Sequence, residues 1–176
     1  LGLFGLGRYS EAVDAYDNLF LVEQNRKEAY CNQAYAYLFL NRTDAAVIAY
    51  DRCTALDPLN FENWDNQGLA LMQAKKYDAA LQSFDHATYI TIKNATIWNH
   101  KGMALMALGR PVDALQCFYK ALGIDPGYAD AQKNKAEATG KQQSFNISGT
   151  ITPTVTISRI GTFFTTTVTT TRPVTV

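Results

Sequence analysis

The sequence predicts an all-α fold in which antiparallel helix pairs stack into an array. The first observation is a pattern that returns after 34 residues between positions 61 and 128. Its two copies are Trp64, Gly68, Leu71, Ala80, Phe84, Ala87 and Trp98, Gly102, Leu105, Ala114, Phe118, Ala121. The second observation is that apolar residues in each copy recur at spacings that return to one face of a helix. A period of this length indicates repeat units that bury their apolar faces only by stacking on one another.

Earlier parts of the chain continue the same register. Residues 27–60 form a looser copy in which aromatic or small residues occupy the pattern positions, namely Tyr30, Ala34, Tyr37, Ala46, Tyr50 and Pro58. Residues 1–26 form a partial copy, because Ala12 and Tyr16 take the Ala and Phe positions within a helix predicted from Ser10 to Val22. The complete copies are therefore residues 27–60, 61–94 and 95–128.

Short breaks divide each copy into two helices. They have the sequences Leu6-Gly7-Arg8, Leu40-Asn41-Arg42, Ala74-Lys75-Lys76 and Leu108-Gly109-Arg110. Gly7 and Gly109 fit the left-handed residue that ends a helix, and Pro111 suits a first helical turn. We expect Ser10 and Thr43 to cap the helices that follow these breaks.

A repeat of 34 residues with Trp, Gly, a large residue, Ala, Phe, Ala and Pro in this order resembles the tetratricopeptide repeat. The closing proline is present as Pro58 and Pro126, whereas Ile92 replaces it in the middle copy. Polar residues stand where the pattern has a leucine before the glycine: Gln33, Gln67 and Lys101. The resemblance covers about residues 1–141. It implies a right-handed superhelical α-solenoid whose first helices line a concave groove.

Two different segments follow the repeats. Residues 129–143 restart a first helix with a polar exposed face, so we expect a capping helix that closes the array. Residues 144–176 contain 12 threonines, no acidic residue, and only Arg159 and Arg172 as basic residues. This Thr-rich, non-helical tail is predicted to be either disordered or β-prone, with a hairpin that turns near Gly161. A flexible stalk that carries sugars is the alternative if the chain is exported.

Composition argues against several classes of function. Lys plus Arg and Asp plus Glu both number 16, so no net charge attracts nucleic acid or an anionic membrane. No apolar run reaches the roughly 20 residues that a membrane-spanning helix needs. Cys31, Cys53 and Cys117 have no close spacing, which argues against a disulfide framework or a thiolate metal site. We expect them to be small core hydrophobes, and we expect no metal and no cofactor.

Catalytic residues are not expected. The two histidines, His86 and His100, fall in helices of different repeats, and neither has a partner at a spacing that predicts an acid–base pair. We expect His86 to be exposed or partly packed and His100 to form hydrogen bonds. The chain is therefore predicted not to be an enzyme.

Candidate binding residues recur every 34 residues along the first helices, on the surface that the resemblance makes concave. Side-chain amides offer a donor and an acceptor, so a line of them can hold the backbone of an extended peptide. An apolar strip beside them is rich in methionine, which adapts to varied side chains. The candidate groove residues are Asn32, Tyr35, Asp65, Asn66, Asn99, His100, Met103 and Asn134. The alternative is that the asparagines serve only helix packing, and that Leu69 and Met106 belong to the core between repeats.

The leading hypothesis is a non-enzymatic scaffold that binds an extended peptide or a partner protein in this groove. Glu28, Glu62 and Asp65 make one edge acidic, so we expect a neutral or basic, partly apolar peptide. Relatives that grip a C-terminal carboxylate use Lys and Asn where this chain has Cys31 and Tyr35. One alternative is a secreted or cell-envelope protein that displays the array on its Thr-rich tail. Another is a structural spacer that self-associates through its N-terminal face. The compartment stays open, with the cytoplasm favoured.

Overall fold

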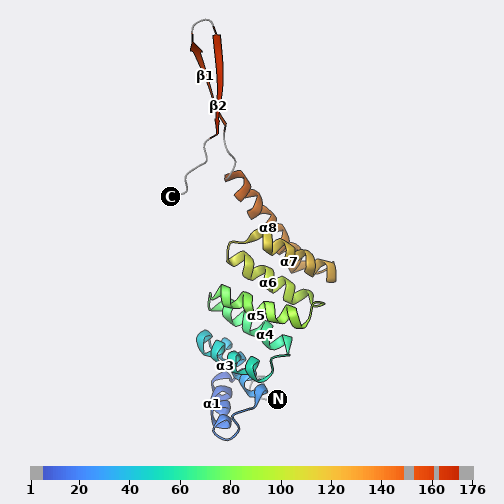
Figure 1. Cartoon of the computed structure of the whole chain (residues 1–176). Helices are drawn as coiled ribbons and strands as arrows, with labels where there is room; N and C mark the ends of the chain where they lie inside the picture. Colours follow the sequence, from blue (N-terminus) through green and yellow to red (C-terminus); the bar gives the residue numbers. More distant parts are fainter. Residues whose placement is uncertain (1–5, 149–152, 161–162, 171–176) are drawn as a thin grey trace.

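The structure is a computed structural model that describes residues 6–148, 153–160 and 163–170. Its helices follow one another along the molecule, and two strands come after the last helix (Figure 1). The helices are α1 (Tyr9–Phe20), α2 (Lys27–Phe39), α3 (Thr43–Leu56), α4 (Phe61–Gln73), α5 (Tyr77–Ile90), α6 (Ala95–Ala107), α7 (Pro111–Ile124) and α8 (Ala129–Ser148). The all-α array predicted for the repeats is confirmed.

Consecutive helices pack as antiparallel pairs. α2 packs on α3, α4 on α5 and α6 on α7, and the second helix of each pair also packs on the next first helix. α1 packs on α2 as the second helix of a partial repeat, and α8 packs on α7 and α6 as a further first helix. The predicted N-terminal association face falls partly on residues 1–5, which lie outside the described residues.

A residue with left-handed backbone conformation precedes the second helix of every pair. The φ angles are 68° at Gly7, 55° at Asn41, 59° at Lys75 and 70° at Gly109. In the three complete repeats the backbone N–H of the following residue donates to the carbonyl five positions earlier, at 2.8 to 2.9 Å. This closes the end of each first helix. The predicted role of Gly7 and Gly109 is confirmed, and Lys75 adopts the same geometry without being a glycine.

The predicted caps at Ser10 and Thr43 are wrong. Both residues lie within the first turns of α1 and α3, and the cap positions before these helices hold arginines that make no side-chain cap hydrogen bond. The tight turns before α1 and α3 bring the arginine, rather than the hydroxyl residue, to the cap position. The longer connections between repeats supply side-chain caps, because Asn60 and Asn94 each accept two backbone N–H bonds at the start of α4 and α6.

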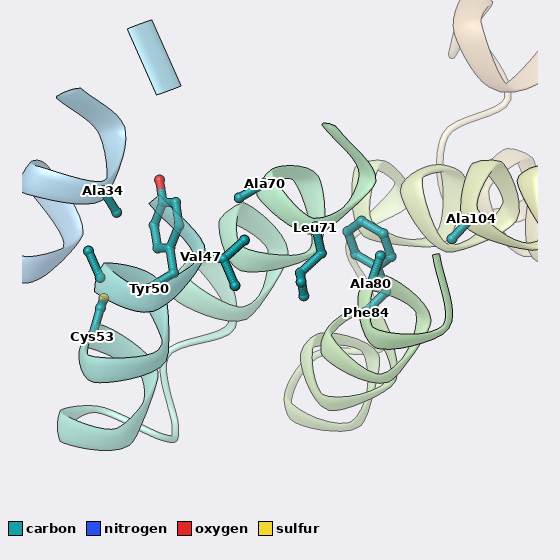
Figure 2. Packing of buried hydrophobic residues seen from close by; sticks show 10 residues of the cluster. Ala34, Val47, Tyr50, Cys53, Ala70, Leu71, Ala80, Phe84 and Ala104 are labelled. Carbon is teal, nitrogen blue, oxygen red and sulfur yellow. The ribbon is translucent and has the colours of Figure 1, made fainter. Parts of the chain in front are cut away.

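Aromatic and small pattern residues form the core of each helix pair. Phe84 and Phe118 are completely buried. A Cβ atom added to Gly68 would lie within 2.8 Å of three atoms of the Phe84 ring, and Gly102 has the same relation to Phe118. The two helices of each pair therefore approach closely at these glycines, and a phenylalanine ring fills the space. Figure 2 shows the ring of Phe84 beside Ala80. The other pattern alanines are equally buried: Ala87, Ala114 and Ala121.

The pattern tryptophans tie each first helix to the connection before it. The indole N–H of Trp64 donates to the carbonyl of Pro58 at 2.8 Å, and that of Trp98 donates to the carbonyl of Ile92 at 2.9 Å. Since the acceptor is a backbone carbonyl, the contact does not need a proline. The replacement by Ile92 therefore leaves it intact.

A polar ladder joins successive repeats at the positions that lack the expected leucine. Each rung links a second helix to the next first helix across 2.6 Å, and the rungs are Asp17–Gln33, Asp51–Gln67 and Asp85–Lys101. Gln67 also accepts a hydrogen bond from Ser83 at 3.0 Å. The three departures from the repeat pattern therefore form one structural feature.

α8 closes the array and extends past its predicted end at residue 143. Ala131 and Ala138 are completely buried and belong to the core cluster of α6 and α7. The helix continues to Ser148, so residues 144–148 are helical rather than part of the tail. The sequence contains no proline or glycine between Lys141 and Ser148 that would end the helix earlier.

Two strands follow α8. β1 (Pro153–Ile160) and β2 (Phe163–Thr170) pair in antiparallel register, with Pro153 opposite Thr170 and Ile160 opposite Phe163. Residues 149–152, 161–162 and 171–176 of the predicted tail lie outside the described residues. Among the helices that the structure describes, none has the length and apolar character needed to cross a bilayer.

Candidate functional site

Exposed positions on α2, α4, α6 and α8 mark a surface that we call the first-helix face. Along α2 they return at helical spacing as Glu28, Asn32, Tyr35 and Phe39. The equivalent residues are at least partly exposed in the other first helices: Glu62, Asn66, Leu69 and Gln73 in α4; Thr96, His100, Met103 and Ala107 in α6; and Asp130, Asn134, Glu137 and Lys141 in α8. All predicted groove residues except Asp65 and Asn99 lie in these rows.

One row of the first-helix face consists of Asn32, Asn66, His100 and Asn134. The first two asparagines of this row have free side chains. Asn32 and Asn66 are exposed, and their side chains make no hydrogen bond or ion pair within the described residues. A free amide can donate to a peptide carbonyl and accept from a peptide N–H. These two side chains therefore have the chemistry that the sequence-based hypothesis requires.

The rest of the row links neighbouring repeats instead. His100 Nδ1 lies 2.9 Å from Asp65 Oδ1, and Asn134 Nδ2 donates to Asn99 Oδ1 at 2.9 Å. Asn99 is only 2% exposed, and its Nδ2 lies 3.7 Å from Met103 Sδ. Both cross-repeat pairs join residues 35 positions apart, so each residue meets the row next to its own. This part of the row serves packing, and Asn99 is not available to a ligand.

Cys31 and Cys53 form a disulfide between α2 and α3, so the expectation of no disulfide is wrong. Their Cα atoms are 5.3 Å apart, within the range that a disulfide requires. Helix pairing brings together cysteines that are 22 residues apart, and spacing along the sequence does not reveal this. The equivalent residues of the next repeat are Asp65 and Ala87. Cys117 is a free, buried thiol whose pKa is raised by burial, as a core residue should be.

A pocket of about 270 Å³ opens on the first-helix face between α4, α6 and α8. Its apolar lining includes Met72, Met103, Met106 and Phe118. Asn134, Glu137 and Lys141 supply its polar rim. Glu137 and Lys141 form an ion pair at 2.8 Å, which lowers the pKa of Glu137. The predicted methionine strip therefore lines a hollow, and Met106 contributes to this hollow as well as packing against the core.

Aromatic rings occupy the α2 end of the first-helix face. Phe39 stacks on Tyr9 with ring centroids 4.3 Å apart, and it meets Tyr35 edge-on at 4.9 Å. Tyr35 and Phe39 remain 48% and 52% exposed. The face thus presents aromatic rings at one end, free amides next to them, and the methionine pocket at the other end.

Comparison with known families agrees with this architecture. One model of the tetratricopeptide repeat matches residues 27–58 and 61–91, and a second model of the same description matches residues 95–128. Together these segments make up more than half of the 176-residue chain. The chain belongs to the tetratricopeptide repeat family. A comparison with curated protein sequences gives no match.

Solved structures with tetratricopeptide repeats share the fold. A crystal structure of the MamA protein superposes with a TM-score of 0.76 at 18% identity, over 82% of this chain and 79% of that one. The structure titled MamA MSR-1 C2 gives 0.69 at 26% identity, over 82% and 83%. The first repeat domain of Spaghetti (RPAP3), bound to the HSP90 peptide SRMEEVD, gives 0.64 at 18% identity, over 69% and 97%.

The tetratricopeptide repeats place the two histidines in stabilising contacts. His86 stacks on the ring of Trp64 with centroids 4.4 Å apart, and His100 is held by Asp65. Within the residues that the structure describes, no group of three or more His, Cys, Asp or Glu side chains could hold a metal ion.

Two residues of the tetratricopeptide repeat surface escaped the sequence analysis. Lys141 lines the methionine pocket, and Tyr9 of the partial repeat completes the aromatic group. The repeat spacing could have identified Lys141, because it lies 34 positions after Ala107 and 102 positions after Phe39, in the same row. No comparable signal exists for Tyr9, because it lies in a second helix.

Proposed function

We propose that this chain is a non-enzymatic protein-interaction module that binds an extended peptide segment of a partner protein on its first-helix face. The observation that carries the proposal is the methionine pocket, which hollows that face between three first helices. Methionine side chains adjust their shape, so such a pocket accepts apolar side chains of varied form. Tetratricopeptide repeats of this fold in RPAP3 are seen with bound peptides, which supports peptide binding as the activity of this chain.

The charges of the face indicate what kind of peptide fits. Glu28, Glu62 and Asp130 form an acidic row along the start of α2, α4 and α8, and no basic residue belongs to that row. The RPAP3 peptides SRMEEVD and SGPTIEEVD are acidic and would be repelled there. The proposed ligand of this face is a neutral or basic peptide whose apolar side chain enters the methionine pocket. Asn32 and Asn66 would hold its backbone.

The test starts from a random peptide library selected against the full chain. The selected peptides should combine an apolar residue with Lys or Arg, and SRMEEVD should not compete with them. Met103 is 38% exposed in the pocket, so Met103→Glu should weaken binding by at least about tenfold without loss of the fold. Tyr89, which is 89% exposed on the second helix α5, provides the control Tyr89→Glu. If both variants bound the peptides equally well, the first-helix face would not be the binding site.

A second candidate function is display of the array by an exported protein, and the disulfide is the observation that favours it. Disulfides persist in oxidising compartments and are rare in the cytosol. Asn41-Arg42-Thr43 and Asn94-Ala95-Thr96 are also acceptor sequences for N-glycans. The intact mass of the protein from its native source decides the matter: a closed disulfide with added hexose mass supports export. An unmodified chain with free thiols at Cys31 and Cys53 contradicts it.

A further inference from the structure

Two adjoining pockets lie outside the first-helix face, where α2 meets α3. One has a volume of about 320 Å³ and is lined mainly by apolar groups, including Tyr37 and Ile48. The other has a volume of about 270 Å³ and includes Leu56 in a more polar lining. Tyr30 and Arg52 line both pockets. The two pockets therefore adjoin at Tyr30 and the cationic Arg52, and we call them together the cleft.

The other repeats show what normally happens at the position of Arg52. Its equivalents 34 and 68 residues later are His86 and Lys120. His86 stacks on Trp64, and Lys120 Nζ lies 4.1 Å from the centroid of the Trp98 ring. In both of these repeats the side chain at this position is therefore in contact with the tryptophan ring.

In the first complete repeat this contact is absent. Tyr30 stands in place of the tryptophan, and its ring stacks on Phe20 with centroids 4.0 Å apart. Its hydroxyl donates to the carbonyl of Gln24 at 3.1 Å. Arg52 is exposed and makes no hydrogen bond, ion pair or ring contact within the described part of the chain. A guanidinium without a partner is thus left between a mainly apolar pocket and a more polar one.

Two further features fit the cleft for binding. Cys31 follows Tyr30 and Cys53 follows Arg52, so the disulfide fixes the distance between the two walls. A site whose walls are already fixed loses less conformational freedom when a ligand binds. Ile48 is 65% exposed at a position where the other two complete repeats have glutamine.

We propose that this cleft binds a carboxylate attached to an apolar group, with Arg52 holding the carboxylate and the pocket of Tyr37 and Ile48 holding the apolar part. An arginine fork matches both oxygens of a carboxylate, and the bond is strengthened by charge. The cleft shares no lining residue with the methionine pocket, so this proposal does not depend on the proposed function. A peptide C-terminus that ends in an apolar residue and a small carboxylic acid share this chemistry.

The test is a titration of the full chain followed by the chemical shifts of its backbone amides. The probes are 3-phenylpropionate, its uncharged amide, and the peptide acetyl-Gly-Gly-Phe with a free carboxylate. We expect both acids to shift the amides around Tyr30 and Arg52, and the uncharged amide to bind at least about tenfold more weakly. Tighter binding of the peptide identifies a peptide end as the source, and equal binding identifies a free acid. Absence of shifts at these amides, or equal binding of the uncharged amide, overturns the proposal.

Two variants and one control test the residues. Arg52→Gln should weaken both acids by about tenfold, because it removes the charge and the fork. Ile48→Gln should weaken them too, and it introduces the residue that the other two complete repeats have at this position. Lys93→Gln removes an exposed charge from a different repeat and should leave binding unchanged. Equal effects of Arg52→Gln and Lys93→Gln would show general charge attraction and would overturn the proposal.

Discussion

Gly68 shows how much of this fold depends on one missing methyl group. The Phe84 ring fills the space that a side chain at position 68 would occupy, and Phe84 is itself completely buried. Gly68→Ala must therefore displace a ring in a close-packed core, and overpacking of this kind costs about 1–3 kcal/mol. We expect the free energy of unfolding, measured by urea denaturation, to fall by that amount.

Gly123 offers a matched control for this substitution. It also lies in a helix, but it is exposed, and a Cβ atom built there meets no atom within 4 Å. Gly123→Ala should be neutral or slightly stabilising, because alanine is the better helix former. If both substitutions had the same effect, helix propensity rather than the contact with Phe84 would explain the glycine at position 68.

At the scale of the helix pair, the disulfide singles out α2 and α3. Their core is the loosest copy of the pattern, with Ala34 and Tyr50 in place of the close glycine–phenylalanine contact. A cross-link that closes a loop of this length stabilises by about 3 kcal/mol. We expect reduction of Cys31–Cys53 to make α2 and α3 the first segment cleaved in limited proteolysis, while α4 to α7 stay resistant.

The free thiol Cys117 supplies the control for this experiment. Cys117→Ala removes a buried group that forms no cross-link, so its effect should be the same with and without reductant. The double substitution of Cys31 and Cys53 by alanine should resemble the reduced protein even under oxidising conditions. Resistance of α2 and α3 after reduction would show that the helix pair is stable without the bond.

The helix pairs can be predicted from the sequence because their signals are local. The breaks at Gly7 and Gly109 and the spacing of the apolar residues specify the helices and their turns. The disulfide could not be predicted this way, because it depends on how closely two helices approach. The pairing of His100 with Asp65 is hidden for a similar reason, since it requires the offset between stacked first helices. The sequence therefore predicts which face is exposed better than it predicts which polar groups on that face are already occupied.

At the scale of the whole molecule, each repeat contacts mainly its neighbours, so the joints decide whether the array unfolds as one unit. The polar ladder contributes one rung to each joint between complete repeats. Because a rung holds a second helix to the next first helix, loss of one rung should weaken one joint. The helices on the two sides of that joint should then unfold separately, instead of the whole array losing stability evenly.

Gln67 is the rung at which this can be tested. It is 5% exposed, donates to Asp51 at 2.6 Å and accepts from Ser83 at 3.0 Å. Gln67→Ala removes the hydrogen bond to Asp51 at the joint between α3 and α4, and also the bond from Ser83 of α5 within the same repeat. Together these losses should cost about 1–3 kcal/mol. In hydrogen exchange the protection of α1 to α3 should fall well below that of α6 and α7. The exposed Gln82 provides the control Gln82→Ala, which should change neither segment. An equal loss of protection along all helices would mean that the repeats are coupled too strongly for a single joint to separate them.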